Sequence, residues 1–585
     1  MQESAPRASD VRKGMPSDGA LLAGFLVFNG LFRLALIRLN TGEYTDGILQ
    51  ITQFERSDSF WPPLYAALVH VLEGAGLSGI AAGRLISWAA SLLLILPLWR
   101  AARAWGGRRC AFFTLILYTV SPEALRWSLR VMTDMLFTCL FHLACGALLA
   151  LRMRDAATSL DGDQRAPDAL PGAGSDPQDP GRSAGWAIVW ITVLSVLAAL
   201  TRYHGLMLLP LVVWEVVRIW RRDRVGRGDR VGRGDRVRRR DRVGRRDRVR
   251  RERSPGRWAA ALAQMLWITL PAWLLYQRFG HVAQVAERQA DNLGATLLNY
   301  WYTFEMFLFI IPYVMTLPVF LFFVVGVVRG TGKDPLAPRQ ARPVSVRALL
   351  LYAALAVLIA QSVFQSFQTR YLLPLLPLAL TCAGAGMAHM ESALSRHGRL
   401  GHRVILALVG LTVVWSLGFG LASVCLQRQA FGDVFEAGKA IRVNTGLSRE
   451  ARVYSNEIYK PAMVGVKLAY AAGRTVEMIP EWPYLSDWAR RGGPLPQDVP
   501  RMAPGSVVAI HSAYGGPSAQ SALLRLLGER YDLRPLGRGS FQASIVPLLP
   551  DIMEEPLTHQ NPLAWLLRYQ RQQFSTLLFV VAGDK

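Results

Sequence analysis

Apolar residues in this chain come in long uncharged runs separated by short polar loops. Several runs reach roughly 18 to 22 residues, the length that an α-helix needs to cross the core of a bilayer. The first run carries Arg33 and has no small-residue cleavage site, so it predicts a retained span and not a signal peptide. The pattern predicts an α-helical polytopic membrane protein with about eleven transmembrane helices, at residues 19–39, 80–99, 110–127, 131–151, 185–201, 204–220, 258–277, 306–328, 347–366, 371–390 and 404–425.

The loops between these runs differ in their content of lysine and arginine. Nearly all of these residues fall in one alternating set of loops, at 1–18, 100–109, 152–184, 221–257, 329–346 and 391–403. Because cytoplasmic loops carry the positive excess, this set predicts an N-terminus inside, a C-terminus outside and loop 40–79 on the outer face. The lack of an Asn-x-Ser/Thr sequon agrees with a bacterial source, and hence the inner (plasma) membrane, and the high Arg, Ala and Gly content suggests a GC-rich genome.

Beyond Leu426 the long apolar runs stop and shorter segments begin. Strands are predicted at 451–456, 505–512 and across 531–549, and a helix at 519–529 lies between two of them. These elements predict a small soluble α/β domain on the outer side, within residues 426–585 and with its last element near 550. The domain has no Gly-rich phosphate loop and no nucleophile elbow. Its charged residues are therefore expected to be solvated surface: Asp433, Glu436, Lys439 and Glu457.

The formal net charge of +24 is typical of a nucleic-acid-binding protein, but its distribution argues against that class. Residues 221–253 hold 17 Arg and 6 acidic residues, so this segment alone supplies +11. Its DRVGRG-like unit repeats every six residues, which matches neither a helix face nor a strand face and predicts a disordered cytoplasmic segment. Attachment to anionic lipids and reinforcement of the topology are both open as its role. No nucleic-acid partner is expected.

The stretch after the first span, residues 40–63, puts acidic residues at a membrane surface ahead of a Trp-Pro-Pro stop. Read as a helix, its apolar side holds Tyr44, Ile48, Ile51 and Phe54 or Glu55. Its polar side holds Asp46, Gln50 and Gln53. Such a helix would rest its apolar side on lipid and present a carboxylate to a cavity. An ordinary solvated loop is the alternative.

Charged residues at or inside span ends are costly and usually line a water-filled cavity. On the predicted outer side, five separate chain regions bring acids, arginines and aromatic residues to the same depth. They are Glu43, Asp46, Arg84, Glu123, Arg130, Asp134, Arg202, Tyr203, His204, Arg370 and Tyr371. Each alone has an ordinary explanation, such as snorkelling or an interhelical ion pair. Together they predict an anion-binding site with a carboxylate beside it.

The order of several motifs resembles the glycosyltransferase C superfamily. After the acidic first loop come PPLY (Pro62–Tyr65), AGRLISW, YTVSPEALRWSLRVMTDML, LAALTRYHGLMLLP and RYLLPLLP, which together cover about residues 19–390. Within the superfamily the chain is most similar to bacterial relatives of the protein O-mannosyltransferases. That branch includes the lipid A aminoarabinose transferase and the rhizobial lipopolysaccharide galacturonosyltransferases. A soluble outer C-terminal domain is also usual for such enzymes.

The resemblance implies a polyprenyl-phosphate-linked sugar donor and transfer of a hexose or pentose on the outer face to a glycan, glycolipid or protein. By motif position, Asp46 matches the catalytic acid of the first loop, and Asp134 matches the acidic position at the start of the fourth span. Many relatives have adjacent acids, whereas two residues separate Glu43 from Asp46 here. It stays open which of the two is the base and whether a divalent metal is held; no other cofactor is implied.

The residue types suit this chemistry. A carboxylate base takes the proton of the acceptor hydroxyl, and arginines meet the charge that develops on the leaving phosphate. The candidates for the phosphate are Arg370, Arg202, Arg130 and Arg84. The candidates for positioning sugar or acceptor are Tyr371, Tyr203 and His204. Glu123 either orients an arginine or reacts.

Two other classes of protein remain open at this point. A lipid-linked sugar flippase would also be polytopic, but transporters are commonly built from internal repeats, and the two halves of this chain show no correspondence. A non-catalytic assembly protein on the same scaffold is favoured only by the departure of the acidic motif from the superfamily pattern.

Overall fold

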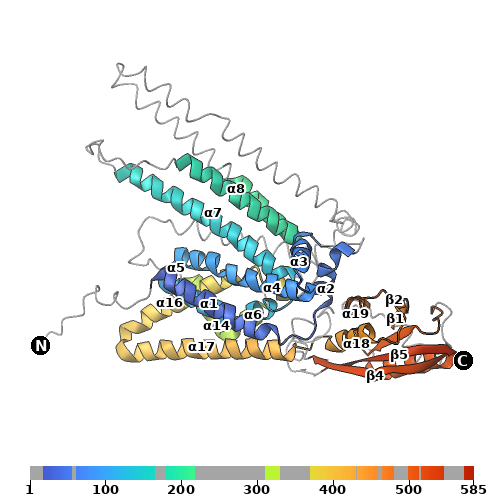
Figure 1. Cartoon of the computed structure of the whole chain (residues 1–585). Coiled ribbons are helices and arrows are strands. Elements are labelled where there is room, and N and C mark those ends of the chain that lie inside the picture. Colours follow the sequence, from blue (N-terminus) through green and yellow to red (C-terminus); the bar gives the residue numbers. More distant parts are fainter. Residues whose placement is uncertain are drawn as a thin grey trace, which may run out of the picture.

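The computed structural model describes residues 17–55, 61–164, 180–215, 217, 310–329, 369–429, 431–456, 464–479, 499–512, 516–545 and 572–585. The predictions for spans 258–277 and 347–366, for the Arg-rich segment and for Glu457 lie outside the described residues. In the described part, a bundle of long helices is joined at one end to a smaller unit of strands and helices (Figure 1).

The bundle is made of helices that begin and end close to the predicted spans. Its first half contains α1 (Asp18–Ile37), α4 (Gly79–Leu93), α5 (Ile95–Val120), α6 (Pro122–Trp127), α7 (Thr133–Gln164) and α8 (Pro180–Thr201). Its second half contains α14 (Leu317–Arg329), α16 (Leu376–Leu394) and α17 (Gly398–Leu426). Among the described residues, four regions are long and apolar enough to cross a membrane: Asp18–Ile37, Gly79–Val120, Thr133–Met153 and Leu376–Leu426. The helical membrane architecture is confirmed, and the count of eleven spans stays a prediction.

Glycines break the two longest of these apolar regions inside predicted loops. In α5 the helical geometry is interrupted at Gly106 and Gly107, where φ reaches 78° at the second glycine. Helices α16 and α17 meet at Gly398, with φ 69°, and form a hairpin (Figure 1). Glycine takes positive φ at little cost, so both breaks follow from the local sequence.

Ion pairs gather the predicted cytoplasmic ends of several helices at one end of the bundle. Asp18, at the start of α1, pairs with Arg103 and lies 3.0 Å from Arg108. Arg109 lies 3.5 Å from Glu391, near the end of α16. The strand-containing unit lies at the opposite end (Figure 1). The helices therefore alternate in direction as predicted, while the assignment of the two ends to inside and outside remains a prediction.

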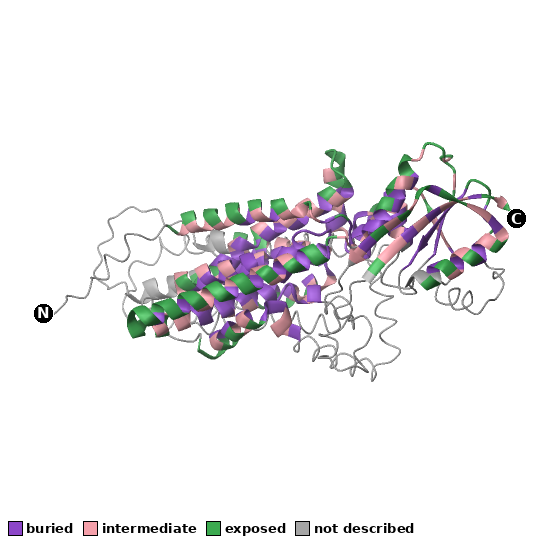
Figure 2. Cartoon of the chain, turned by 90° about the horizontal axis from the view of Figure 1, so that it is seen from below, coloured by how far each residue is buried: buried purple, intermediate pink, exposed green. Residues whose placement is uncertain are grey.

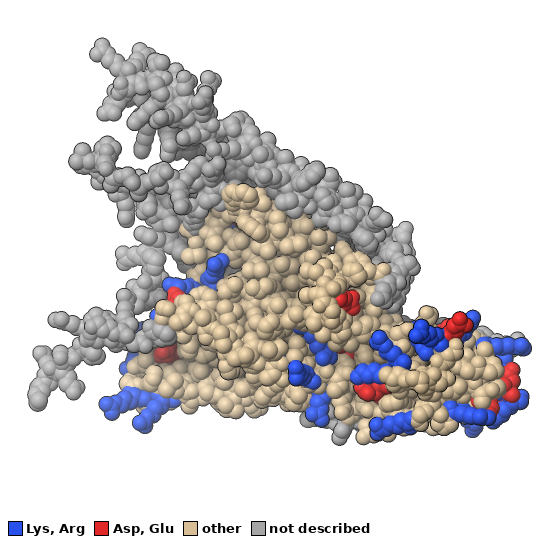
Figure 3. All heavy atoms as spheres, viewed as in Figure 1, with Lys and Arg blue, Asp and Glu red and all other residues tan. Residues whose placement is uncertain are grey.

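The surface between the two ends is that of a membrane protein. On the face drawn in Figure 3, the described surface of the bundle carries almost no charge between its ends. Large apolar side chains are exposed along its helices, with Phe28 57%, Trp190 60% and Trp415 57% exposed (Figure 2). In water such a continuous apolar surface would be a liability, whereas lipid tails solvate it.

The C-terminal unit is built on a sheet of five strands in the order β2-β1-β3-β5-β4. Its strands are β1 (Val453–Asn456), β2 (Val476–Ile479), β3 (Val507–His511), β4 (Tyr531–Ile545) and β5 (Gln572–Asp584). Strand β1 is parallel to β2 and β3, and β5 is antiparallel to β3 and β4. The helices are α18 (Gly432–Val443), α19 (Val464–Ala472) and α21 (Gly516–Arg530).

Three predicted strands and one predicted helix are present as β1, β3, β4 and α21. Within the stretch 531–549, which was predicted as two segments, Tyr531–Ile545 form a single strand, β4, whose register against β5 shifts between Pro535 and Ser540. Strands β2 and β5 were not predicted, and β5 takes the unit beyond residue 550. The sheet needs β5 because it lies between β3 and β4 and buries Leu578 and Val581.

The prediction that the charged residues of this unit are solvated is wrong for Asp433. Its side chain is fully buried, accepts a hydrogen bond from Thr576 Oγ1 at 2.8 Å and lies 2.9 Å from His511 Nε2. Strand β5, which supplies Thr576, was absent from the predicted domain, so nothing in the sequence indicated that it covers the start of α18. Glu436 and Lys439 are exposed, as predicted, and they form an ion pair with each other.

Glycines let α14 and α16 approach closely, as small residues do at interfaces between membrane helices. A Cβ at Gly386 would lie 2.0 Å from the carbonyl oxygen of Phe322. We expect Gly386→Ala to lower stability by about 1–3 kcal/mol, because the backbone must move to relieve the overlap. The matched control is Gly410→Ala on α17, where no atom lies within 4 Å of the added Cβ. Melting temperatures in detergent test this, and equal values for the two variants would contradict it.

Candidate active site

The outer loop after α1 folds into helix α2 (Thr45–Ile51), a turn of 3-10 helix (Gln53–Glu55) and α3 (Leu64–Gly74). The prediction that the apolar side of α2 rests on lipid is wrong. Ile48 and Ile51 are 0% and 7% exposed and pack in a cluster with residues of α3 and α4 and with Phe435 and Ala471 of the C-terminal unit. The apolar side faces protein because the C-terminal unit covers it, which hydropathy alone does not reveal.

The polar side of α2 presents Asp46 to Arg370, an arginine 324 positions later in the sequence. Asp46 forms an ion pair with Nη2 of Arg370, which lies in the 3-10 turn Thr369–Leu372 just before α16. The Arg370 side chain is 5% exposed and that of Asp46 is 30% exposed. Arg370 Nη2 also donates to the hydroxyl of Tyr371 at 3.5 Å, and Nη1 lies 3.3 Å from the sulfur of Met132.

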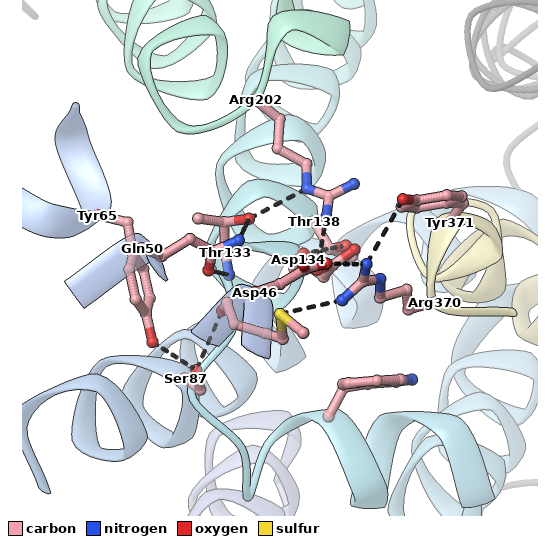
Figure 4. A network of polar contacts seen from close by, with 12 residues as sticks. Asp46, Gln50, Tyr65, Ser87, Thr133, Asp134, Thr138, Arg202, Arg370 and Tyr371 are labelled. Carbon is pink, nitrogen blue, oxygen red and sulfur yellow. Dashed lines mark hydrogen bonds and ion pairs between the residues drawn. The ribbon is translucent and has the colours of Figure 1, made fainter. Parts of the chain in front are cut away.

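A second ion pair lies beside the first (Figure 4). Arg202 Nη2 donates to Asp134 Oδ2 at 2.7 Å, and Arg202 Nε donates to Thr133 Oγ1 at 3.1 Å. The ring of Tyr371 is shared by both arginines, with the guanidinium carbons of Arg202 and Arg370 each 5.2 Å from its centroid. Gln50 of α2 accepts from the backbone N–H of Thr133 at 3.1 Å, so α2 and the start of α7 are joined directly.

Glu43, the other acid of the first loop, belongs to a different pair. Its Oε1 accepts from Arg84 Nε at 2.5 Å and its Oε2 accepts from the backbone N–H of Val131 at 3.2 Å. The Glu43 side chain is 0% exposed. Both carboxylate oxygens are therefore engaged inside the protein, and Arg84 is held by Glu43 and by the carbonyl of Gly42 at 3.3 Å.

Arg130 and Glu123 make contacts of their own with the first loop and within α6. Arg130 donates to the backbone carbonyls of Gly42, at 2.8 Å, and of Gln427. Its guanidinium lies over the ring of Tyr44, 5.1 Å from the centroid. Glu123 is 7% exposed and accepts from the indole N–H of Trp127 at 2.6 Å. The contacts of Arg130 tie the first loop to the segment between α6 and α7 and to the end of α17.

Tyr203 and His204 follow Arg202 in a 3-10 turn and are partly exposed. The His204 ring packs against Phe137, with 6.3 Å between centroids. Phe137 is one helical turn from Asp134 along α7. The structure thus brings together Asp46, Asp134, Arg202, Arg370 and Tyr371, with Tyr203 and His204 at their border, and places Glu43, Arg84, Arg130 and Glu123 in neighbouring contacts of their own.

Sequence reasoning missed Lys467, which reaches this site from the C-terminal unit. Its ammonium donates to the hydroxyl of Thr45, the residue before Asp46, and is fully buried. The available signal was a single lysine within the otherwise uncharged helix VGVKLAYAA. Among the described residues, no three His, Cys, Asp or Glu side chains converge in a way that could hold a metal ion.

The buried position of Lys467 makes stability depend on pH. Burial lowers the pKa of Lys467 from 10.5 to about 7, and the charges of Asp46 and Asp433 oppose this shift. Between these two values the unfolded chain binds a proton that the folded protein has released, so raising the pH favours the folded state. From pH 7 to pH 9, wild type should gain roughly 2 kcal/mol relative to Lys467→Met. Melting temperatures of both proteins across this range test the prediction, and parallel pH dependences would contradict it.

No protein-family model matches the sequence, and no curated protein matches it. The fold does match solved structures at low sequence identity, which shows a likeness of fold. ArnT from Cupriavidus metallidurans bound to undecaprenyl phosphate is similar, with a TM-score of 0.52 and 15% identity, over 89% of this chain and 97% of that chain. The archaeal oligosaccharyltransferase AglB from Archaeoglobus fulgidus, in complex with an inhibitory peptide and a dolichol-phosphate, gives a TM-score of 0.46 at 12% identity, over 88% of this chain and 72% of that chain.

Proposed function

We propose that this protein is an integral-membrane glycosyltransferase that moves a hexose or pentose from a polyprenyl-phosphate donor to a hydroxyl acceptor. The reaction takes place on the outer face of a bacterial plasma membrane, and the acceptor is a glycolipid, an envelope polysaccharide or a protein. The observation that carries the proposal is the partly exposed Asp46 carboxylate, paired with Arg370 beside the buried Asp134–Arg202 pair. The complex of the similar ArnT with undecaprenyl phosphate supports a lipid phosphate as the donor group.

Asp46 is the general base of the proposed reaction. Its side chain is 30% exposed, whereas those of Glu43, Asp134 and Glu123 are 0%, 2% and 7% exposed. A base must touch the acceptor hydroxyl, so exposure separates Asp46 from the other three acids. As the acceptor oxygen bonds to the anomeric carbon, Asp46 takes its proton and the bond from that carbon to the phosphate oxygen breaks. A single displacement of this kind inverts the anomeric configuration.

Arg370 and Arg202 receive the leaving phosphate. One nitrogen of the Arg370 fork is committed to Asp46, but Nη1 meets only a thioether sulfur, which is a weak acceptor. Among the described residues, Nε of Arg370 is buried without a hydrogen-bond acceptor. Two donor nitrogens are thus available to phosphate oxygens, in a buried position where a charged hydrogen bond is strong.

The remaining predicted residues support Asp46, Arg370 and Arg202. Asp134 is buried on Arg202 and orients it, while Tyr371, Tyr203 and His204 position the sugar or the acceptor. Arg84 and Arg130 hold Glu43 and backbone carbonyls, and so keep the first loop in place. They are not the primary ligands of the phosphate.

Sugar transfer in detergent-opened membranes tests the proposal. Radiolabelled polyprenyl-phosphate sugars are supplied, and the label is followed into lipid, polysaccharide and protein fractions. We expect label to leave the donor and enter one fraction, which identifies the acceptor class. If the donor stays intact but crosses the bilayer of sealed vesicles, the protein is a flippase and the proposal fails. If neither transfer nor transport occurs with any donor, the assembly-protein hypothesis takes its place.

A further inference from the structure

Lys467 lies where the C-terminal unit meets the helix that carries Asp46. It comes from α19, and its ammonium donates to Thr45 Oγ1 in the first turn of α2. The ammonium also lies over the ring of Phe431, 3.7 Å from the centroid. Phe431 precedes α18 in the left-handed conformation, with φ 54°, which a bulky residue rarely adopts. One buried lysine therefore contacts both α2 and the start of α18.

Packing alone does not account for this lysine. Burying an ammonium costs free energy, and a methionine of similar length would fill the same space without that cost. The nearby acid of α18, Asp433, is engaged by Thr576 Oγ1 and lies 2.9 Å from His511 Nε2 on β3. The amino group of Lys467 donates to the hydroxyl beside Asp46.

Helix α2 needs such a contact to hold its direction. It has seven residues, and no side chain caps its N-terminus. A helix of this length is marginal by itself, so its orientation depends on what packs against it. Ile48 and Ile51 supply apolar contacts, but these tolerate rotation and sliding. A hydrogen bond to Thr45 is directional and acts one residue from the carboxylate.

We infer that Lys467 is a positioning residue of the transferase reaction, which sets the Asp46 carboxylate through Thr45 and makes the C-terminal unit part of the active site. The inference rests on the proposed function. The C-terminal unit is then not an independent module attached to a complete catalytic bundle. Donor binding, which uses Arg370 and Arg202 of the bundle, does not require Lys467, whereas the chemical step does.

The full-length protein tests this with three variants and one control. We expect Lys467→Met to lower kcat roughly 10- to 100-fold, because a small displacement of a base is costly, while the KM for the donor and the Kd for polyprenyl phosphate stay near wild type. Thr45→Val, which removes the acceptor at constant shape, should have a similar effect. The double variant should be no slower than the slower single variant, since both substitutions break one connection. The control is Lys439→Met, an exposed lysine on the adjacent helix α18.

Each outcome decides for or against the inference. Polyprenyl-phosphate binding at full stoichiometry shows that a slow variant is folded. A kcat for Lys467→Met within about twofold of wild type, or a double variant slowed by the product of the two single effects, overturns it. If Lys467→Met does not fold, the milder Thr45→Val decides, and a normal kcat there overturns the inference. If the wild-type protein has no transfer activity, the proposed function is refuted instead. If Asp46→Asn is inactive while Lys467→Met is unaffected, only the role of Lys467 is refuted.

Discussion

Replacing Asp46 with asparagine is expected to lower the rate of sugar transfer by roughly 100- to 10,000-fold, the contribution of a general base. Asparagine keeps the shape of the side chain and can still accept a hydrogen bond from Arg370, so the fold should hold. It has no basic oxygen that can take the proton of the acceptor hydroxyl. The measurement is kcat with saturating donor and acceptor, together with the Kd for polyprenyl phosphate, which should change little.

The matched control for this variant is Asp532→Asn in β4, an exposed acid whose partner Arg534 is also exposed. It should be as active as wild type. A kcat for Asp46→Asn within tenfold of wild type would remove Asp46 from the role of base. Glu43 and Asp134 would not be ready substitutes, because both are buried in ion pairs.

The second large effect is expected at Arg370. Arg370→Gln should reduce kcat/KM for the donor by roughly 100- to 1,000-fold, because it removes the buried positive charge that meets the leaving phosphate. The same substitution also leaves Asp46 without its ion-pair partner, so both the base and the leaving group are affected. We expect weaker binding of polyprenyl phosphate as well, measured as a higher Kd.

Arg370→Lys separates charge from geometry. Lysine keeps the positive charge but offers one nitrogen in place of a planar fork, so it cannot hold Asp46 and the phosphate at the same time. It should recover binding of polyprenyl phosphate better than it recovers kcat. Arg534→Gln, in the exposed pair of β4, is the control. Unchanged donor binding in Arg370→Gln would assign the phosphate to Arg202 or to another group.

The resemblance to the superfamily pointed to two loops that the structure brings together, but not to the contacts between them. Asp46 and Arg370 were both singled out, one as a base and one as a phosphate ligand, and their direct pairing was not foreseen. Asp134 was assigned to catalysis by motif position, and its burial on Arg202 favours an orienting role. Motif position favoured Asp46 over Glu43 but left the choice of base open, and the greater exposure of Asp46 now favours it further.

Hydropathy by itself determined the membrane class and the positions of the helices, because transfer into lipid depends on runs of neighbouring residues. Glycine placement determined the turns at Gly107 and Gly398, because glycine has a backbone freedom that other residues lack. Positive charge in alternate loops similarly predicted which polar residues share one end of the bundle. Tertiary structure alone decided which acid pairs with which arginine, that the apolar side of α2 is covered by protein, and that Lys467 reaches Thr45. These contacts join residues from 41 to 422 positions apart, and their energies depend on distance and burial, which no local pattern in the sequence encodes.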